Sequence, residues 1–502
     1  MEKRIVDVIF DEIWDKLKEE DFMQFTGYWN KVEYGAKLSA FSRTIRRVAE
    51  CLTLGYHEGR FFYFNGRIWK NVDAEAIKFA YAMMLERVNL SHLNQYVSVF
   101  KDAFLGTLKY RNVLRPRLDV VAFENGVLDC KDFTFHQFSP SYHVVSYFPF
   151  KYKPKEKCPK WNAFLREVLP DKNSRVILQM FLGLSLMERS SVYDNDGHGN
   201  NVELCLMLLG SGGNGKSTIY RTIAGIFGQG KISGLDYSDI VRPTDEGLRA
   251  RACMRGKIFN WCVDSDNNSF GKKHVEIFKK CVSGEALLDR RIGENVAENA
   301  HMPYLIFNLN DLPLINNGLA MVRRLQYINF NVTIPKVKQN PNLANELVEE
   351  YSGIFNWIVR GTRELKYKKF VFPDSSGSKR LLVQSVVNSD PTLAWIKAYD
   401  IRYAPEALHE LGVLIPSGEM YEYLERWLHY NCLDHVLPTK NQFGRDMQKD
   451  GFEKVRKSDG MYYKIYGCDD KTLSRDLAID DISYTYNDDG TRDEKSYIGE
   501  DD

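Results

Sequence analysis

The chain has 502 residues, a length that predicts about three domains, each able to bury its own core. Hydrophobic residues make up 44% and charged residues 27%, as in ordinary globular proteins. The formal net charge of +1 excludes a uniformly basic, histone-like protein, whereas local basic patches remain compatible with nucleic-acid binding. The charge is also uneven, because residues 467–502 hold 12 acidic and 4 basic side chains, a net charge of −8.

No apolar run approaches the roughly 20 residues that a membrane-spanning helix needs. The N-terminal sequence MEKRIVDVIFDEIWDKL indicates a charged amphipathic helix and lacks the core of a signal peptide. The nine cysteines are scattered and form no CxxC pair, so a zinc ribbon would have no ligands at the usual spacing. We therefore expect a soluble cytoplasmic protein without membrane association, whose cysteines are small core residues.

The N-terminal region, residues 1–155, combines helical patterns with aromatic-rich segments and predicts an α+β domain. The segment FFYFNGRIWK (61–70) predicts two short strands around an Asn-Gly turn, the strongest short-range hairpin signal. Residues 74–88 carry a helical pattern, and residues 118–152 are rich in strand signals around a second Asn-Gly turn. The Lys- and Pro-rich segment KYKPKEKCPK (151–160) predicts a linker.

Two further helical patterns, at 161–169 and 174–187, make residues 156–200 a predicted helical connector. From 201 to 370, short apolar strands alternate with helices, which is the pattern of an α/β fold with a parallel sheet covered by helices. The predicted strands are ELCLMLLG (203–210), KIFNWCVD (257–264), YLIFNLN (304–310) and LQYINF (325–330).

The C-terminal region begins after a turn-rich break, VFPDSSGSKR (371–380). Residues 385–466 are mostly helical and end in the basic segment GFEKVRKSDGMYYKIYG, with a predicted hairpin turn at Ser458-Asp459-Gly460. Helices followed by a basic hairpin are typical of a winged-helix domain. The acidic residues 467–502 contain few apolar side chains and predict a tail that is partly disordered.

The sequence GSGGNGKS at 210–217 fits the pattern GxxxxGK[ST] and lies between a predicted strand and a predicted helix, the context that a phosphate loop requires. Its glycines let backbone N–H groups surround phosphate oxygens at a helix N-terminus. Lys216 would reach the β- and γ-phosphates, and the Ser217 hydroxyl would bind Mg²⁺, so ATP and Mg²⁺ are the expected cofactors. The candidate ATP-binding residues are Gly210, Ser211, Gly212, Gly213, Asn214, Gly215, Lys216, Ser217 and Thr218.

Such a loop works with an acidic residue at the end of a neighbouring strand, which holds the metal and polarises water. Asp264 lies directly at a predicted strand end and is the expected Mg²⁺ ligand beside Ser217, with Asp266 as a candidate partner acid. The alternative is a surface aspartate that merely follows a core strand. Asn310 ends the next strand and could sense the γ-phosphate and orient water, although Asn-Asp-Leu-Pro is also ordinary turn chemistry.

Two groups of basic residues have a functional and a structural interpretation. Arg323 and Arg324 precede a strand and could stabilise transition-state charge in a neighbouring subunit, or form a solvated surface pair. A segment between the second and third strands could present cations to DNA phosphates through a hairpin, or form a charge-balanced solvated face. Its candidate DNA-binding residues are Lys279, Lys280, Arg290 and Arg291.

The order of these motifs resembles the superfamily 3 helicases, most of all the poxvirus-type primase-helicase group of phages and mobile elements. The residues that carry the resemblance are GSGGNGKS (210–217), GKIFNWCVDSD (256–266), FKKCVSGE (278–285), FNLNDLP (307–313) and VRRLQYINF (322–330). Two upstream segments, residues 123–140 and 158–171, look like the region that precedes the ATPase in this group. The resemblance covers roughly residues 60–400 and is most specific in the ATPase part.

The resemblance implies an AAA+-like P-loop ATPase that works as a homo-hexamer with active sites between subunits. Lys216 and Ser217 would belong to the first motif, Asp264 to the second, and Asn310 would be the sensor. Arg323 or Arg324 would act in trans. The hairpin would line a central channel and grip one DNA strand, and Lys279 matches the lysine of the family's Lys…Gly segment. The implied function is a DNA helicase, usually moving 3′→5′ on single-stranded and forked DNA, in phage or mobile-element replication inside a bacterial host.

The chain also departs from the family pattern. Many relatives have two adjacent acids at the second strand, whereas this chain has Val263-Asp264-Ser265-Asp266, which leaves the division of metal and base roles open. A primase module would need an Asp-x-Asp cluster, and the first 200 residues show that spacing only at Asp194 and Asp196 in a polar segment. We therefore expect no primase activity in this chain and a separate primase or polymerase as a partner.

Two other functions are compatible with a phosphate loop. The first is an ATPase switch or loader that assembles protein or DNA complexes without unwinding. Whether ATP turnover depends on single-stranded DNA distinguishes it from a helicase. The second is a small-molecule phosphotransferase, which fits poorly with the chain length and the paired arginines.

Overall fold

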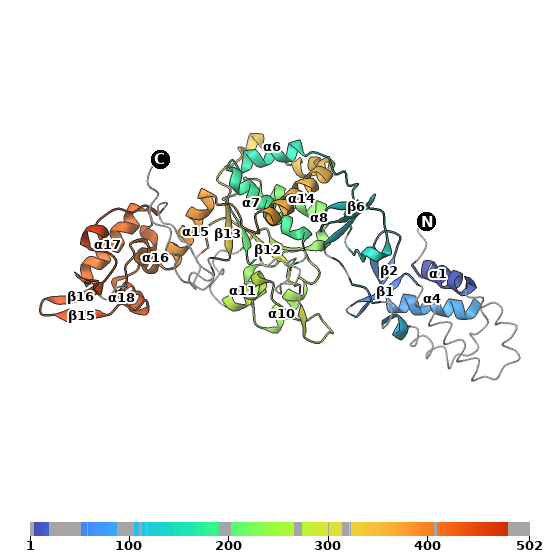
Figure 1. Ribbon diagram of the computed structural model, residues 1–502, viewed down its shortest axis with the longest axis horizontal. Helices are drawn as coiled ribbons and strands as arrows, with labels where there is room; N and C mark the ends of the chain where they lie inside the picture. The colour runs from blue at the N-terminus through green and yellow to red at the C-terminus, as the bar shows by residue number, and fades with distance from the viewer. Residues whose placement is uncertain are drawn as a thin grey trace. The chain divides into compact units, whose positions relative to one another are not determined.

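The structure is a computed structural model that divides into two compact units, Met1–Lys153 and Pro154–Asp502 (Figure 1). It describes residues 5–19, 52–87 except 58, 105–109, 113–115, 117, 119–187 except 146, 189, and 202–479 except 266–273, 300, 314–320, 322 and 406–408. The boundary between the units falls inside the Lys- and Pro-rich segment predicted as a linker. No helix in these ranges combines the length and the apolar character needed to cross a membrane.

Within its described residues, the N-terminal unit contains two antiparallel three-stranded sheets and two long helices. The first sheet has the order β1-β2-β3 (Leu54–His57, Arg60–Phe64, Trp69–Val72), and the second has the order β4-β5-β6 (Val120–Phe123, Gly126–Asp129, Thr134–His136). Helices α1 (Ile5–Glu19) and α4 (Ala74–Arg87) bury apolar side chains against the first sheet. The predicted hairpin is confirmed, because Phe64 pairs with Trp69 across its turn.

The second unit is an α/β structure built on a five-stranded parallel sheet. Its strands are β7 (Cys205–Leu209), β8 (Ile232–Ser233), β9 (Phe259–Cys262), β12 (Tyr304–Leu309) and β13 (Leu325–Asn329), in the order β13-β7-β12-β9-β8. The four strands predicted from their apolar runs are confirmed. Strand β8 was not predicted, because two residues are too few for a periodic pattern. Strands β7, β9 and β12 are buried at every position, as expected when helices cover both faces.

Helices surround this sheet. They are α6 (Pro159–Val168), α7 (Lys172–Gly183), α8 (Lys216–Phe227), α9 (Tyr237–Val241), α10 (Asp245–Ala252), α11 (Val275–Ser283), α13 (Leu343–Glu346) and α14 (Tyr351–Tyr367). α7 and α14 approach so closely that a Cβ on Gly361 would lie 2.0 Å from the Gln179 carbonyl oxygen. The Glu350 carboxylate accepts hydrogen bonds from the backbone N–H groups of Lys160 and Trp161, both at 3.0 Å, which caps α6.

A short antiparallel hairpin leaves the sheet between β9 and β12. We call it the core hairpin; it consists of β10 (Leu287–Asp289) and β11 (Ala297–Asn299). A hairpin was expected at this place. Its loop side chains Ile292 and Val296 are exposed, at 87% and 47%.

The C-terminal segment folds in the order helix, strand, helix, helix, strand, strand. Its elements are α16 (Pro391–Ala398), β14 (Val413–Pro416), α17 (Ser417–Tyr430), α18 (Lys440–Lys449), β15 (Lys454–Lys457) and β16 (Gly460–Ile465), with the sheet order β14-β16-β15. β15 and β16 form what we call the C-terminal hairpin, which Figure 1 draws extending beyond the helices. The expected turn is present, and Lys457 pairs with Gly460 across it.

One prediction for the C-terminal half needs correction, and another is made more precise. The break at 371–380 is helical in its second half, because α15 (Ser376–Ser389) begins there and the Ser375 hydroxyl caps it by accepting from the Ser378 N–H. The tail at 467–502 was predicted to be partly disordered, and the structure shows which part is folded. Helix α19 (Asp470–Leu473) and the residues up to 479 pack against α17, and the Trp427 indole N–H donates to the Leu477 carbonyl at 3.1 Å. Leu473 and Ile479 are buried there, although the acidic composition of the segment did not indicate apolar contacts. Residues 480–502 lie outside the described residues.

The buried side chains of the sheet, of α15 and of the C-terminal segment belong to one continuous cluster. Tyr327 of β13 and Ser385 of α15 share a buried hydrogen bond of 2.8 Å between their hydroxyl groups. The C-terminal segment therefore packs on the sheet through α15.

Candidate functional site

The sheet order creates a switch point at β7. After β7 the chain runs to the edge strand β8, returns through β9 and β12, and then crosses to β13 on the other side of β7. In open parallel sheets, ligands bind outside the carboxyl ends of the strands at such a point. The segment that leaves the carboxyl end of β7 is the predicted phosphate loop, so fold and motif coincide.

The predicted polar residues leave the same edge of the sheet. Leu209 pairs with Leu309, and the Gly210 N–H donates to the Leu309 carbonyl at 3.0 Å, so Gly210 and Asn310 are neighbours. Cys262, the last residue of β9, pairs with Phe307, so Asp264, two residues beyond the strand end, lies at the level of Leu309. The register therefore brings the phosphate loop, Asp264 and Asn310 to one edge, with Asn310 between the other two.

The conformation of the loop depends on glycine. Gly215 has a φ of 89°, and a Cβ at that position would lie 2.8 Å from Val168 Cγ1 of α6. A Cβ on Gly210 would meet the side-chain amide of Asn214 and lie 2.8 Å from the Phe330 carbonyl oxygen. Asn214 is itself buried and directs its amide nitrogen at that carbonyl, 3.5 Å away. The loop is thus held between α6 and the end of β13.

Lys216 opens α8 and is only 6% exposed. Its ammonium group donates to the Gly210 carbonyl and, at 3.2 Å, to the Asn214 side-chain oxygen. Burial lowers the pKa of Lys216, because the charged form loses hydration. Phosphate oxygens at the loop would restore a partner for that charge. The next side chain, Ser217, is exposed at the N-terminus of α8, where its hydroxyl can bind a metal.

Within the described residues, Asp264 and Asp236 both lie near the end of β9, and Asp264 is exposed. The predicted partner acid Asp266 lies outside the described residues. Asp236, which sequence reasoning missed, accepts a short hydrogen bond from the Ser265 hydroxyl. Its loop is held by the buried Asn260, whose side-chain oxygen accepts from the Leu235 N–H at 2.9 Å. Asp236 follows β8, so it could not be placed at this edge while β8 was unrecognised.

The two asparagines of β12 have different environments. Asn308 is buried, and its side-chain oxygen accepts from the Trp261 indole N–H at 3.0 Å, which ties β12 to β9. Asn310 lies beyond the strand end and is exposed. Of the two amides, Asn310 is therefore the one that is accessible to a ligand.

Arg323 and Arg324 precede β13 and so lie at the opposite end of the sheet from the phosphate loop of the same chain. Arg324 is buried and ion-paired with Glu203 at 2.9 Å, and its carbonyl accepts from the Cys205 N–H. Arg323 is exposed. The five residues of β13 span about 16 Å, so an arginine at its start could serve only another subunit's loop. Exposure favours Arg323 over Arg324.

The four predicted DNA-binding cations are not equally available. Lys279 pairs with Glu276 at 3.0 Å, Arg290 with Asp245 at 2.5 Å, and Arg291 with Glu294 at 4.0 Å, whereas Lys280 is exposed. The base of the core hairpin is fixed by Asp289, a fully buried carboxylate that pairs with Arg255.

The C-terminal hairpin presents its cations differently. All four residues of β15, Lys454–Lys457, are exposed. Lys457 lies over the Tyr462 ring and Lys454 over the Tyr463 ring, at 5.3 Å and 5.5 Å from the ring centres. Neither these lysines nor Arg456 is ion-paired within the described part of the chain.

Helix α18 continues this basic surface. A Cβ on Gly444 of α18 would lie 3.5 Å from the Lys454 Nζ, so the hairpin and the helix adjoin. The exposed side chains of α18 include Lys440, Asn441, Gln442 and Arg445. The C-terminal end of α18 is different, because Lys449 pairs with Asp390 at 3.3 Å.

Comparison with known proteins adds two findings. A family described as "D5 N terminal like" matches residues 18–170, which include most of the upstream segments that had suggested a likeness. Apo structures of the NrS-1 C-terminal region are similar at low level. The structure of residues 305–718 shares 13% identity over 84% of this chain and 98% of its own, with a TM-score of 0.40. An A form apo structure of the same region shares 13% identity over 63% of this chain and 76% of its own, also with a TM-score of 0.40.

Proposed function

We propose that this protein is an ATP-driven DNA helicase or translocase of the superfamily 3 type, with an AAA+-like P-loop core. The observation that carries the proposal is the register of the sheet, which brings the phosphate loop, Asp264 and Asn310 to one edge at the switch point. The family match upstream of the loop is compatible with a role in phage or mobile-element DNA replication in a bacterial host.

The residues at this edge fit ATP and Mg²⁺. The N-terminus of α8 offers backbone N–H groups to phosphate oxygens, and within the described residues the buried ammonium group of Lys216 donates to a backbone carbonyl and an amide oxygen rather than to a carboxylate. Ser217 and Asp264 would hold Mg²⁺, which when bound neutralises charge on the β- and γ-phosphates. Asn310 would orient the attacking water, and Asp264, Asp266 or Asp236 would polarise it.

The position of Arg323 supports a ring of identical subunits, in which one subunit's arginine completes its neighbour's site. Six subunits is the number that the family resemblance implies. Single-stranded and forked DNA would pass along the core hairpin, with Lys279, Lys280, Arg290 and Arg291 near phosphates once the ring forms.

A second DNA-contacting surface supports the same function. The order of elements in the C-terminal segment is that of a winged helix, with α18 as the second helix of a helix-turn-helix pair and the C-terminal hairpin as the wing. In such modules the second helix enters the major groove. Arginine and amide side chains, as on α18, are those that read base edges. A separate primase or polymerase would complete the replication machinery.

Steady-state ATP hydrolysis with and without single-stranded DNA tests the proposal. We expect DNA to stimulate turnover severalfold and Lys216→Ala to reduce it at least about 100-fold, because one positioned transition-state charge is worth about 3 kcal/mol. Arg221→Ala changes an exposed cation on the same helix and should leave turnover unchanged. Substantial turnover by Lys216→Ala would refute the assignment of the active site.

One observation favours the alternative, an ATPase switch or loader that does not unwind DNA. Three of the four cations predicted to contact DNA are paired with carboxylates in the single chain. ATP turnover that depends on Lys216 but is indifferent to DNA would support this alternative.

A further inference from the structure

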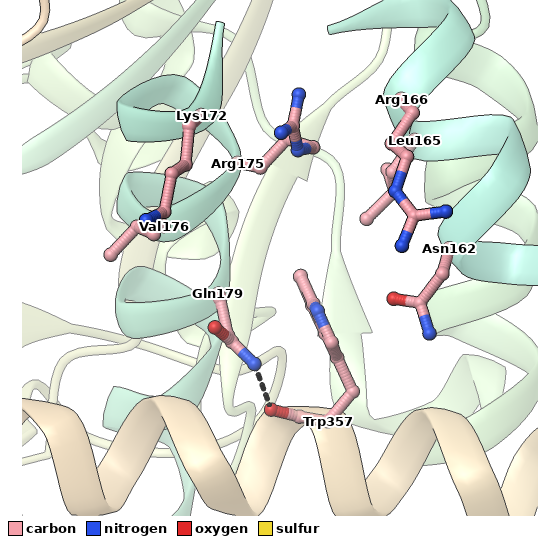
Figure 2. A pocket seen from close by; sticks show the side chains of 8 residues that line it. All are labelled: Asn162, Leu165, Arg166, Lys172, Arg175, Val176, Gln179 and Trp357. Carbon is pink, nitrogen blue, oxygen red and sulfur yellow. Dashed lines mark hydrogen bonds between the residues drawn. The ribbon is translucent and has the colours of Figure 1, made fainter. Parts of the chain in front are cut away.

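A cavity of about 220 Å³ lies among α6, α7 and α14, apart from the phosphate loop. Figure 2 shows its walls: Arg166 and Asn162 come from α6, Lys172, Arg175 and Gln179 come from α7, and Trp357 of α14 lies between them. Three of the eight lining side chains are cations and none is acidic. Nothing in the proposed ATPase mechanism uses this cluster.

The cations are held in different ways. Arg175 uses one guanidinium nitrogen to donate to the carbonyls of Leu169 and Pro170, the latter at 2.6 Å, which fixes it at the α6–α7 connection. Within the described residues, its other guanidinium N–H groups make no hydrogen bond and can donate to a ligand. Arg166 and Lys172 are exposed, and within the described residues neither pairs with a carboxylate. Three uncompensated positive charges around one small cavity repel one another, and an anion would relieve that repulsion.

The walls are set by bonds that need no ligand. The Gln179 amide donates to the Trp357 carbonyl at 2.8 Å, the contact drawn as a dashed line in Figure 2. Trp357 packs edge-on against Trp161 of α6, with ring centres 5.6 Å apart. The part of the wall formed by Gln179 and Trp357 is therefore ordered before a ligand enters and loses little entropy on binding.

Size and chemistry define the ligand class. Sites for drug-sized molecules occupy roughly 300–1,000 Å³, so a cavity of about 220 Å³ suits a small group rather than a whole nucleotide. Guanidinium groups match phosphate oxygens in pairs, and lysine adds a point charge. We propose that this cavity is a phosphate-binding site, which takes either a free diphosphate or a phosphodiester of single-stranded nucleic acid.

The test uses the full-length protein with Lys216→Ala, so that the phosphate loop contributes little to binding. Sodium pyrophosphate should raise its thermal unfolding midpoint, because a ligand that binds only the folded state stabilises it. Adding Arg166→Gln and Lys172→Gln should remove most of that rise. Lys160→Gln, which removes an exposed cation of α6 outside the cavity, should retain it. No rise in the Lys216→Ala protein, or an equal rise in the triple variant, would overturn the proposal.

A second measurement identifies the source of the phosphate and guards against misfolding. Anisotropy of a labelled oligo-dT strand is followed against salt for the Arg166→Gln/Lys172→Gln protein and for Lys160→Gln. A salt slope reduced by about 1–2 units in the double variant alone assigns the site to nucleic acid. An unchanged slope with a lost pyrophosphate effect assigns it to a free diphosphate. If the thermal midpoint of the double variant is already lowered without ligand, Arg166→Lys, which keeps the positive charge, is tested in place of Arg166→Gln. The rise in midpoint with pyrophosphate should then return, and its continued absence would overturn the proposal.

Discussion

The two hairpins of the second unit both contain adjacent basic residues, yet these cations have different partners. In and around the core hairpin, Arg290 and Arg291 pair with carboxylates, and Asp289 at its base is fully buried against Arg255. In the C-terminal hairpin, Lys454 and Lys457 lie over tyrosine rings and β15 is exposed throughout. Basic residues alone mark both hairpins as candidates for DNA contact, whereas the carboxylates around the core hairpin and the contacts of both separate a charge-balanced element from an available basic surface.

The physical reason for the difference is the neighbourhood of each hairpin. The core hairpin lies against α10, which supplies Asp245, and its own loop supplies Glu294. An ion-paired arginine must give up or share its partner before it can bind phosphate, so its gain on binding DNA is smaller. A lysine over an aromatic ring keeps its charge uncompensated. The following predictions test this contrast.

The largest effect should come from breaking the buried pair of the core hairpin. Arg255→Ala leaves Asp289 buried without its partner and should lower the free energy of unfolding by about 3 kcal/mol. Urea unfolding followed by circular dichroism measures this. Arg249→Ala removes an exposed pair with Asp245 on the same helix and should cost less than about 1 kcal/mol. Equal effects of the two changes would contradict the proposed role of the buried pair.

The next largest effect concerns duplex DNA. Neutralising the C-terminal hairpin by Lys454→Ala, Arg456→Ala and Lys457→Ala should weaken duplex binding at least about tenfold and lower the salt slope by about 2–3 units, because each phosphate contact contributes close to one unit. Neutralising the core hairpin by Arg290→Ala and Arg291→Ala should change duplex binding less. Fluorescence anisotropy of a labelled duplex against salt measures both. A greater loss of duplex binding in the core-hairpin variant than in the C-terminal-hairpin variant would contradict the contrast between the two hairpins.

The smallest effect lies at the acidic end of α18. Burial, and the nearby Asp390 carboxylate, raise the pKa of Asp450 and of Asp446, although Lys449 acts in the opposite direction. Because the folded state then holds protons that the unfolded state has lost, stability should fall as pH rises above about 4 through these raised pKa values. Asp450→Asn should raise stability at pH 7 by at most about 1 kcal/mol and flatten that dependence. Urea unfolding midpoints of both proteins at pH 5 and pH 7 measure this dependence. A steeper pH dependence of stability in Asp450→Asn than in the unchanged protein would contradict a raised pKa of Asp450.

Much of the candidate site could be predicted from local sequence. The phosphate loop is contiguous, and Asp264 and Asn310 each follow a long apolar strand, so they could be found without knowing how the strands pair. Asp236 could not be found in this way, because β8 has only two residues and the loop that follows β8 is held by Asn260 of another strand. The fold of residues 467–479 was missed for a similar reason: Leu473 and Ile479 are too sparse to give a pattern, and only the surface of α17 makes them core residues.

The sequence by itself determined the strand and helix alternation, the phosphate loop and the two polar residues at strand ends, because each depends on neighbours within about ten residues. The tertiary structure decided which of the paired arginines is exposed, which basic residues are neutralised and where three cations gather around a cavity. Glu203 and Arg324 are far apart in sequence and meet only because β7 pairs with β13. The pair of Arg290 with Asp245 and the approach of Trp357 to the cations of α6 and α7 are likewise long-range contacts, which no local pattern records, whereas the pairs Lys279–Glu276 and Arg291–Glu294 join residues three apart.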